Sequence, residues 1–291
     1  MSESKEFRKA MLLFERYMDS RDRSDRTIIG YRRDLTMVEN YLKNRYGSRI
    51  YVHDVTTNDI EDYLLMLKVE KQYKASSRNR HIGALKSFYK FCQREGWASA
   101  SPLEQIEKIR GPQKEREILE FNEVNTFITA IDHPLIRVVA QCLYYTGLRI
   151  SECLGLRYED VNLERRRIWV SAGKGNKSRS VPINERLLFI LADYLDVQTD
   201  SGSSEYFFAT KKSGQLSNVY VNRILDRTRV KLGWRKRVSA HTFRHSFASH
   251  LVRKGVNIAD IQKILGHSDL KTTSVYLHTD QDSLLASVDL L

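Results

Sequence analysis

The sequence predicts a two-domain protein that is mainly α-helical, with a small antiparallel sheet in its second half. Residues 1–108 carry four apolar stripes with helical period. Residues 109–117 carry a Gly-Pro pair and then a charged tract without apolar period, and two alternating segments flank a glycine-rich stretch at 172–177. A chain of 291 residues is long enough to bury two cores. We therefore expect domains at 1–108 and 118–291, joined by a linker at 109–117.

The first half is expected to form a compact bundle of four short helices. Thr56 and Asp59 are three residues apart before an apolar stripe, which predicts a capped helix start. Gly96 is expected to end the fourth helix. The predicted buried faces are Phe7, Ala10, Met11, Phe14, Tyr17 and Met18; Ile28, Tyr31, Leu35, Val38 and Leu42; Ile60, Leu64 and Leu67; and Ile82, Leu85, Tyr89 and Cys92.

The predicted fourth helix also carries a run of basic residues. These are Arg78, Arg80, Lys86 and Lys90. They are candidates to lie along a DNA backbone, although such a run is more often only a solvated face.

The second half opens with two helices that lead to an arginine. Val124, Phe127, Ile128 and Ile131 form one stripe, and Pro134 begins the next, through Val138, Val139, Cys142 and Leu143. Gly147 is expected to stop this helix, which places Arg149 at the junction with a third helix. Two partners for this arginine remain open: a phosphate, or a structural salt bridge to Glu152 or Asp160.

A hairpin is expected after this junction, from strands near 167–171 and 180–183. Its tip at 172–177 places Lys174 on a glycine-rich loop, where it could reach a neighbouring cleft or be an ordinary loop lysine. Lys177 and Arg179, beside this lysine, are further candidate DNA contacts. Two more helices are expected near 187–195 and 219–232.

The stretch from His241 to Tyr276 contains two histidines, an arginine and a tyrosine at spacings that would allow their side chains to share one site. His241 and Arg244 are three apart and should share a helix face. A helix beginning after Asn257 should end at Gly266, which leaves His267 on the turn that follows. Tyr276 is expected on one more short helix, nine residues later.

Charge favours an extended anionic partner, for which nucleic acid is the commonest choice, although a merely basic soluble protein is the alternative that composition leaves open. Net charge is +12; residues 1–116 carry 24 Lys and Arg against 17 Asp and Glu, and residues 117–291 carry 24 against 19. The excess is therefore shared by both halves and is not a detachable tail. The three cysteines are odd in number and have apolar helical neighbours, so we expect free core thiols in a soluble, cytoplasmic protein without a signal peptide or membrane span.

These residues suit phosphodiester cleavage without a metal or nucleotide. Arginines match phosphate bidentately, imidazoles donate hydrogen bonds or shuttle protons, and lysine can protonate a leaving alkoxide. A tyrosine can act as the nucleophile, because a phosphotyrosyl bond can be reversed by a returning hydroxyl. A zinc-peptidase motif is the rival for His241 to His245, but Thr242 occupies the position where that motif needs glutamate.

Five motifs in this order resemble the tyrosine, or integrase-type, site-specific recombinases, most closely their two-domain Xer-like members. The motifs are Thr146-Gly147-Leu148-Arg149-Ile150-Ser151-Glu152, Gly173-Lys174-Gly175-Asn176-Lys177, His241-Thr242-Phe243-Arg244-His245-Ser246-Phe247-Ala248, Leu265-Gly266-His267 and Tyr276. The resemblance covers the second half strongly and the first half weakly. It implies a SAM-like four-helix core-binding domain followed by a mixed α/β catalytic domain.

The resemblance also implies roles and partners. Tyr276 would form a 3′-phosphotyrosyl link, Arg149 and Arg244 would clamp the phosphate with help from His241 and His267, and Lys174 would be the general acid. Four protomers would assemble on two double-stranded DNA sites and exchange strands through a Holliday junction, and the apolar tail after Tyr276 would dock in trans or fold back in cis. Two alternatives remain open: a type IB topoisomerase-like relaxing enzyme, and a DNA-binding accessory protein that does not cut.

Overall fold

The computed structural model describes residues 5–47, 49–112, 117–171, 178–197, 204–210 and 214–266. The chain divides into two compact units, Met1–Lys114 and Glu115–Leu291, here called the N-terminal and C-terminal units. Residues 113–116, at the end of the predicted linker, lie outside the described residues.

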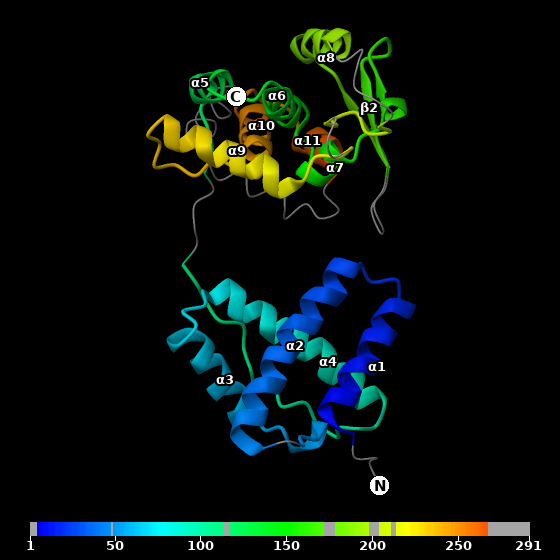
Figure 1. Ribbon diagram of the computed structural model, residues 1–291, viewed down its shortest axis with the longest axis vertical. Coiled ribbons are helices and arrows are strands. Elements are labelled where there is room, and N and C mark those ends of the chain that lie inside the picture. Colours follow the sequence, from blue (N-terminus) through cyan, green and yellow to red (C-terminus); the bar gives the residue numbers. More distant parts are fainter. Residues whose placement is uncertain are drawn as a thin grey trace, which may run out of the picture. The chain divides into compact units, whose positions relative to one another are not determined.

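The N-terminal unit is a helical bundle, as predicted. It contains α1 (Phe7–Ser20), α2 (Asp25–Tyr46), a short 3-10 turn (Val52–Asp54), α3 (Thr57–Val69) and α4 (Ala75–Arg94). All four predicted stripes contribute side chains to its core. Helices α2 and α4 contact each other, and each also contacts α1 and α3 (Figure 1). Phe88 contacts the rings of Phe7 and Phe14 at centroid distances of 5.0 and 5.6 Å, and Phe14 also contacts Phe91 at 5.4 Å.

The predicted start of the third helix is confirmed. The Asp59 amide donates to Thr56 Oγ1 at 3.2 Å, and the Thr56 amide donates to Asp59 Oδ2 at 2.9 Å. This reciprocal pair satisfies two amides that the first helical turn would otherwise leave without partners. Gly96 follows α4 with a φ of 74°, a conformation that glycine adopts without strain.

The C-terminal unit combines helices with a three-stranded antiparallel sheet, so the predicted fold class is confirmed. Its elements are α5 (Phe121–Thr129), α6 (Pro134–Thr146), α7 (Ile150–Leu154), a 3-10 turn (Tyr158–Asp160), β1 (Val161–Asn162), β2 (Arg167–Val170), β3 (Arg179–Pro182), α8 (Glu185–Val197), α9 (Asn218–Lys231), α10 (Ala240–Arg253) and α11 (Ile258–Leu265). The strand order is β1-β2-β3, and Val170 pairs with Arg179. The short β1 is an element that the sequence did not predict.

Helix α6 forms the centre of this unit. It packs against α5, α7, α8 and α10, and the sheet lies at one edge (Figure 1). The helix ends that precede the candidate residues Arg149 and His267 in the chain are both left-handed glycines, Gly147 after α6 and Gly266 after α11, each with φ of 66°. A Cβ at Gly147 would collide with Phe247 and lie 2.8 Å from Leu265 Cδ2. Both the positive φ and the lack of space therefore require glycine at this turn.

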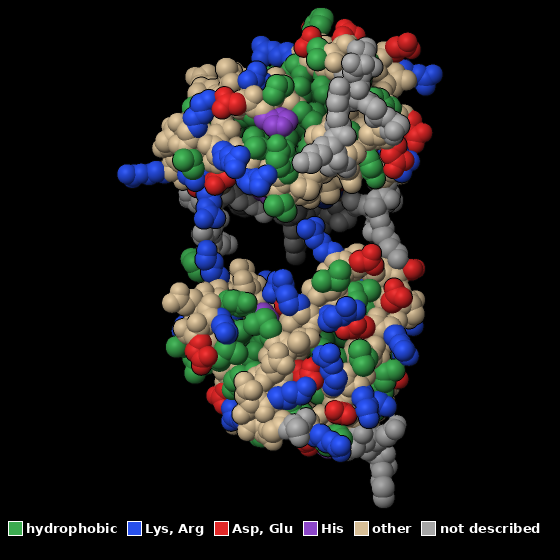
Figure 2. Space-filling model, in the orientation of Figure 1, with side chains coloured by type: hydrophobic (Ala, Val, Ile, Leu, Met, Phe, Trp, Pro, Cys, Tyr) green, Lys and Arg blue, Asp and Glu red, His purple; other side chains and the backbone are tan. Residues whose placement is uncertain are grey.

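The expected core position of the three cysteines is confirmed. The three cysteines are free and buried, and burial raises the pKa of the Cys92 thiol to about 12. Within the described residues, none of the helices combines the length and apolar character needed to cross a bilayer. Lys and Arg side chains lie on the visible face of both units, with Asp and Glu between them (Figure 2).

Candidate active site

Arg149 is positioned by the turn between α6 and α7. Gly147 ends α6, Leu148 is buried, and Arg149 is the N-cap of α7. Its Nη1 donates to Glu152 Oε1 at 2.8 Å, and its backbone amide donates to Glu152 Oε2 at 2.8 Å. The salt bridge to Glu152 is therefore present, whereas Asp160 accepts instead from the Arg157 amide. The Arg149 side chain remains 35% exposed and is accessible to an external anion.

Arg244 has a different environment, because its side chain is only 2% exposed. It projects from α10, where Nη1 donates to the Gly147 carbonyl at 2.6 Å and Nη2 donates to the Leu265 carbonyl at 2.9 Å. The same Nη1 lies 3.9 Å from Glu152 Oε2. Arg244 is thereby hydrogen-bonded to Gly147, which lies 97 positions earlier in the chain.

Arg179, which the sequence suggested as a DNA contact, places its guanidinium inside the C-terminal unit. Nη1 and Nη2 donate to the two carboxylate oxygens of Glu152, at 3.0 and 2.7 Å, and Nε donates to the Ile264 carbonyl at 2.8 Å. Its side chain is 10% exposed. The signal that could have indicated this was its place as the first residue of β3, two positions before the buried Val181, so that both side chains lie on the same face of the strand.

Glu152 is the common partner of these three arginines. Burial alone would raise the pKa of Glu152, but the hydrogen bonds from Arg179 and Arg149 and the charge of Arg179 outweigh it and lower the pKa to about 2. The carboxylate is therefore ionised at neutral pH. Three guanidinium groups around one carboxylate leave an excess of positive charge, which suits a site that receives a phosphate.

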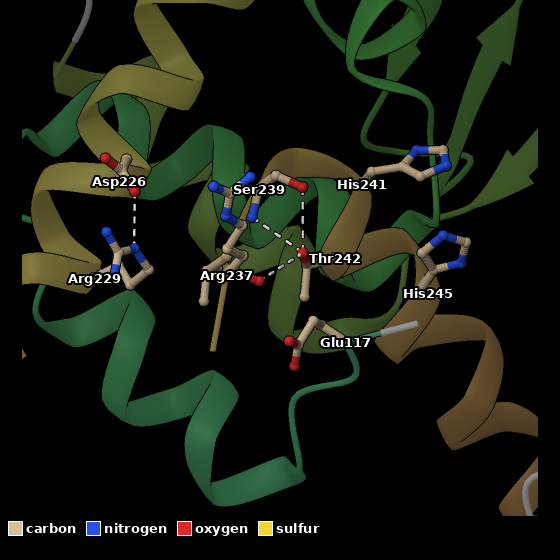
Figure 3. A pocket seen from close by; sticks show the side chains of 9 residues that line it. Glu117, Asp226, Arg229, Arg237, Ser239, His241, Thr242 and His245 are labelled. Carbon is tan, nitrogen blue, oxygen red and sulfur yellow. Dashed lines mark hydrogen bonds and ion pairs between the residues drawn. The ribbon is translucent and has the colours of Figure 1, made fainter. Parts of the chain in front are cut away.

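His241 and His245 lie on α10, the helix that also carries Arg244. They are one helical turn apart with ring centroids 4.5 Å from each other and nearly perpendicular planes, and both border an open pocket of about 650 Å³ (Figure 3). His241 is exposed although Arg244, on the same helix, is buried, so sharing a helix did not give them similar surroundings. The remaining pocket residues are Glu117, Asp226, Arg229, Arg237, Val238, Ser239 and Thr242.

His250 is a packing residue. It is buried, its ring stacks on Phe121 with a centroid distance of 3.8 Å, and its Nδ1 hydrogen-bonds the Tyr144 hydroxyl at 2.9 Å. Burial lowers the pKa of His250, which favours the neutral ring.

Four of the predicted site residues lie outside the described residues: Lys174, Lys177, His267 and Tyr276. Two described elements border them in the chain. The strands β2 and β3 flank residues 172–177, and Gly266, which follows the last residue of α11, directly precedes His267.

The basic residues proposed for DNA contact on α4 differ in their surroundings. Arg80 Nη2 donates to Asp34 Oδ1 at 2.8 Å, and this carboxylate is 1% exposed. Lys86 Nζ donates to the Ile106 carbonyl at 2.7 Å. Arg78 is half-buried, and Lys90 is exposed. Arg80 and Lys86 are exposed as well, so what distinguishes Lys90 is that it has no such partner among the described residues.

Comparison with known proteins covers both units. The Phage integrase family matches residues 117–283, and the "Phage integrase, N-terminal SAM-like domain" matches residues 12–96. A tyrosine recombinase of Pseudothermotoga lettingae is 34% identical over 282 residues, which cover 94% of this chain and 95% of that protein. Tyrosine recombinase XerC of Oceanobacillus iheyensis is 31% identical over 273 residues, with 89% and 87% covered.

A solved structure has the same fold. The integrase of transposon Tn1549, in complex with a circular intermediate DNA, superimposes with a TM-score of 0.81 at 20% identity, with 97% of this chain and 99% of that chain covered. Together with the sequence relatives, both family matches and the arginine cluster lead to one assignment. The chain belongs to the phage integrase family of tyrosine recombinases, enzymes that break and rejoin DNA at specific sites.

Proposed function

We propose that Tyr276 attacks the scissile phosphate of a DNA recombination site and forms a 3′-phosphotyrosyl link, which frees a 5′-hydroxyl. Arg149 and Arg244 bind the non-bridging oxygens of that phosphate. The observation that supports this is their convergence on Glu152, with Nη1 atoms 2.8 and 3.9 Å from its oxygens, although they are far apart in the chain. Two fixed guanidinium groups at one point can stabilise the charge that grows on phosphorus oxygens in the transition state.

The remaining roles follow the chemistry of each side chain. Lys174 is the general acid that protonates the leaving 5′-oxygen, with Lys177 as the nearby alternative. His241 and His267 donate hydrogen bonds to the phosphate or move the proton of the nucleophile. The exposure of His241 at an open pocket supports a role in contacting substrate. None of these steps uses a metal or a nucleotide.

Duplex DNA is the partner that we propose for both units. Residues 1–108 form the core-binding domain, 109–117 the linker and 118–291 the catalytic domain. The shared positive charge and the exposed Lys90 support contacts along the phosphate backbone. Secondary candidates for such contacts are Arg78, Lys177 and the exposed part of the Arg80 side chain. We place this activity in the cytoplasm, which suits three free buried thiols.

Recombination requires more than one active site, because two duplexes must each be cut twice. We therefore propose four protomers on two sites, strand exchange in two rounds and a Holliday junction between them. The apolar residues after Tyr276, which include Leu284, Leu285 and Val288, would dock on a neighbouring protomer.

The covalent step is tested with a DNA site selected from a random duplex library by the full chain carrying Tyr276→Phe. A nicked version of that site loses the short fragment after cleavage, which traps the enzyme on DNA. The unaltered protein should give an adduct that resists SDS, and Tyr276→Phe should bind the site without forming one. An adduct from Tyr276→Phe would show that another residue is the nucleophile.

Strand exchange is tested by mixing two labelled sites of unequal length. Recombinants and a four-way junction on a native gel are the expected products. Relaxation of supercoiled DNA without either product would instead indicate a topoisomerase-like activity.

A further inference from the structure

The end of α11 is held by three arginines from three different elements. Its last carbonyl groups have no partner within the helix, as at any helix C-terminus. Here Ile264 O accepts from Arg179 Nε at 2.8 Å, Leu265 O accepts from Arg244 Nη2 at 2.9 Å, and Gly266 O lies 3.4 Å from Arg149 Nη2. Cations are favourable at this negative end of the helix dipole.

The same three arginines divide the oxygens of Glu152 unequally. Arg179 engages both oxygens, whereas the Arg149 guanidinium reaches only Oε1 and Arg244 stays 3.9 Å from Oε2. A carboxylate without Arg179 would be free to take a second hydrogen bond from Arg149. Arg149 needs the same two parallel hydrogen bonds to bind a phosphate, so Glu152 and the substrate would compete for the Arg149 guanidinium.

Close packing explains why arginine suits this position. A Cβ at Gly266 would lie 2.8–2.9 Å from Nη1, Cδ and Cζ of Arg179, so the planar guanidinium is pressed against the backbone of the turn. A lysine ammonium has one nitrogen and could not join both carboxylate oxygens and the Ile264 carbonyl with the same geometry.

We propose that Arg179 is a positioning residue for DNA cleavage: it neutralises Glu152 and joins it to the end of α11, which leaves the Arg149 guanidinium available for the scissile phosphate. Arg179 does not touch the substrate in this arrangement. The inference deepens the proposed function, because it assumes that Arg149 binds phosphate.

The experiment separates loss of charge balance from loss of packing. Arg179→Met removes the charge and keeps most of the side-chain length. Arg179→Met combined with Glu152→Gln removes both charges of the pair. Arg179→Lys keeps the charge without the fork. Arg167→Met, on the neighbouring strand β2, is the matched control, because Arg167 is exposed and bonds only weakly to Ser180 Oγ at 3.4 Å.

Two quantities are measured for each variant: the single-turnover rate constant of adduct formation on the nicked site, and the Kd for the intact site. Arg179→Met should slow adduct formation by about 10²-fold, the effect typical of losing one preorganised donor, and should change Kd by less than about 3-fold. Adding Glu152→Gln should recover at least about 10-fold of the rate, Arg179→Lys should be intermediate, and Arg167→Met should match the unaltered protein.

Two results would overturn the proposal: a rate for Arg179→Met within about 3-fold of the unaltered protein, or a double variant no faster than Arg179→Met. If Arg179→Met alone does not fold, the double variant carries the test. Its residue 152 has no carboxylate to compete with phosphate for Arg149, so a rate more than about 10²-fold below that of the unaltered protein would also overturn the proposal.

Binding of inorganic phosphate to the DNA-free protein distinguishes this inference from the proposed function. Titration calorimetry should show that phosphate binds about 10-fold more weakly to Arg179→Met than to the unaltered protein. The affinity for phosphate should recover in the double variant. If the unaltered protein forms no adduct, the proposed function is refuted. The phosphate affinities of the variants would still decide the role of Arg179. Equal phosphate affinity in all variants would refute that role.

Discussion

Arg179 holds both carboxylate oxygens of Glu152, at 3.0 and 2.7 Å, across 27 residues of sequence. The pair joins the sheet to the first turn of α7 and lies beside two more arginines. A buried carboxylate is costly unless it is paired and hydrogen-bonded. This relationship is therefore central to both the stability and the proposed chemistry of the C-terminal unit.

Acid should destabilise the C-terminal unit through Glu152. Its pKa is lowered from 4.5 to about 2, so the folded state is favoured when Glu152 is ionised. The stabilisation is complete above the unfolded pKa of 4.5 and is lost as the pH falls through 2. The pKa difference corresponds to about 3 kcal/mol. Urea unfolding at pH 7, 4 and 2.5 measures it, and Glu152→Gln should lack this part of the pH dependence. Identical pH profiles for the two proteins would contradict the assignment.

Gly147→Ala should destabilise the C-terminal unit by at least about 2 kcal/mol. The residue has φ of 66°, and a Cβ would collide with Phe247 and approach Leu265. Equilibrium urea unfolding provides the measurement. Gly83→Ala is the matched control, because Gly83 lies within α4 and its Cβ would meet nothing within 4 Å. That control should gain about 0.5–1 kcal/mol from helix propensity. Equal effects of the two substitutions would refute the steric argument.

Arg244→Met should reduce both stability and cleavage. It removes the donor to the carbonyls of Gly147 and Leu265 in a site from which water is largely excluded. Leaving buried acceptors without partners costs about 1–3 kcal/mol each, so we expect a loss of about 2–4 kcal/mol in unfolding free energy. Adduct formation should fall by at least about 10²-fold.

The control for Arg244 lies on the same helix. Arg253→Met removes an ion pair with Glu120 at the surface of the unit and should change stability by less than about 1 kcal/mol. If both substitutions in α10 had the same effect on unfolding, the buried hydrogen bonds of Arg244 would not be the cause.

Lys90→Ala and Arg80→Ala should affect DNA binding differently. Lys90 is exposed, so its loss should weaken binding and make the slope of log K against log salt less negative by about 0.9. Arg80 pairs with the buried Asp34, so its removal should chiefly destabilise the N-terminal unit, by about 1–2 kcal/mol. Gel shifts at several salt concentrations and thermal unfolding separate the two effects. An unchanged salt slope for Lys90→Ala would exclude a phosphate contact.

Local features of the chain were readable from the sequence. The four apolar stripes, the Thr56 and Asp59 cap, the start of α6 at Pro134 and the glycines that end α6 and α11 all appear as predicted. Each depends on residues within a few positions of one another, so period and spacing determine it. The order of the motifs likewise indicated the family.

The sequence by itself determined which helices form, where they end and which residue types could act on a phosphate. Tertiary structure decided the partners: Arg179 binds Glu152 and not solvent, Arg244 is buried while His241 is exposed, and Arg149 is shared with a helix end 117 residues later. The physical reason is distance along the chain. The surroundings of a long charged side chain depend on which remote segments approach it, and local periodicity contains no information about that approach.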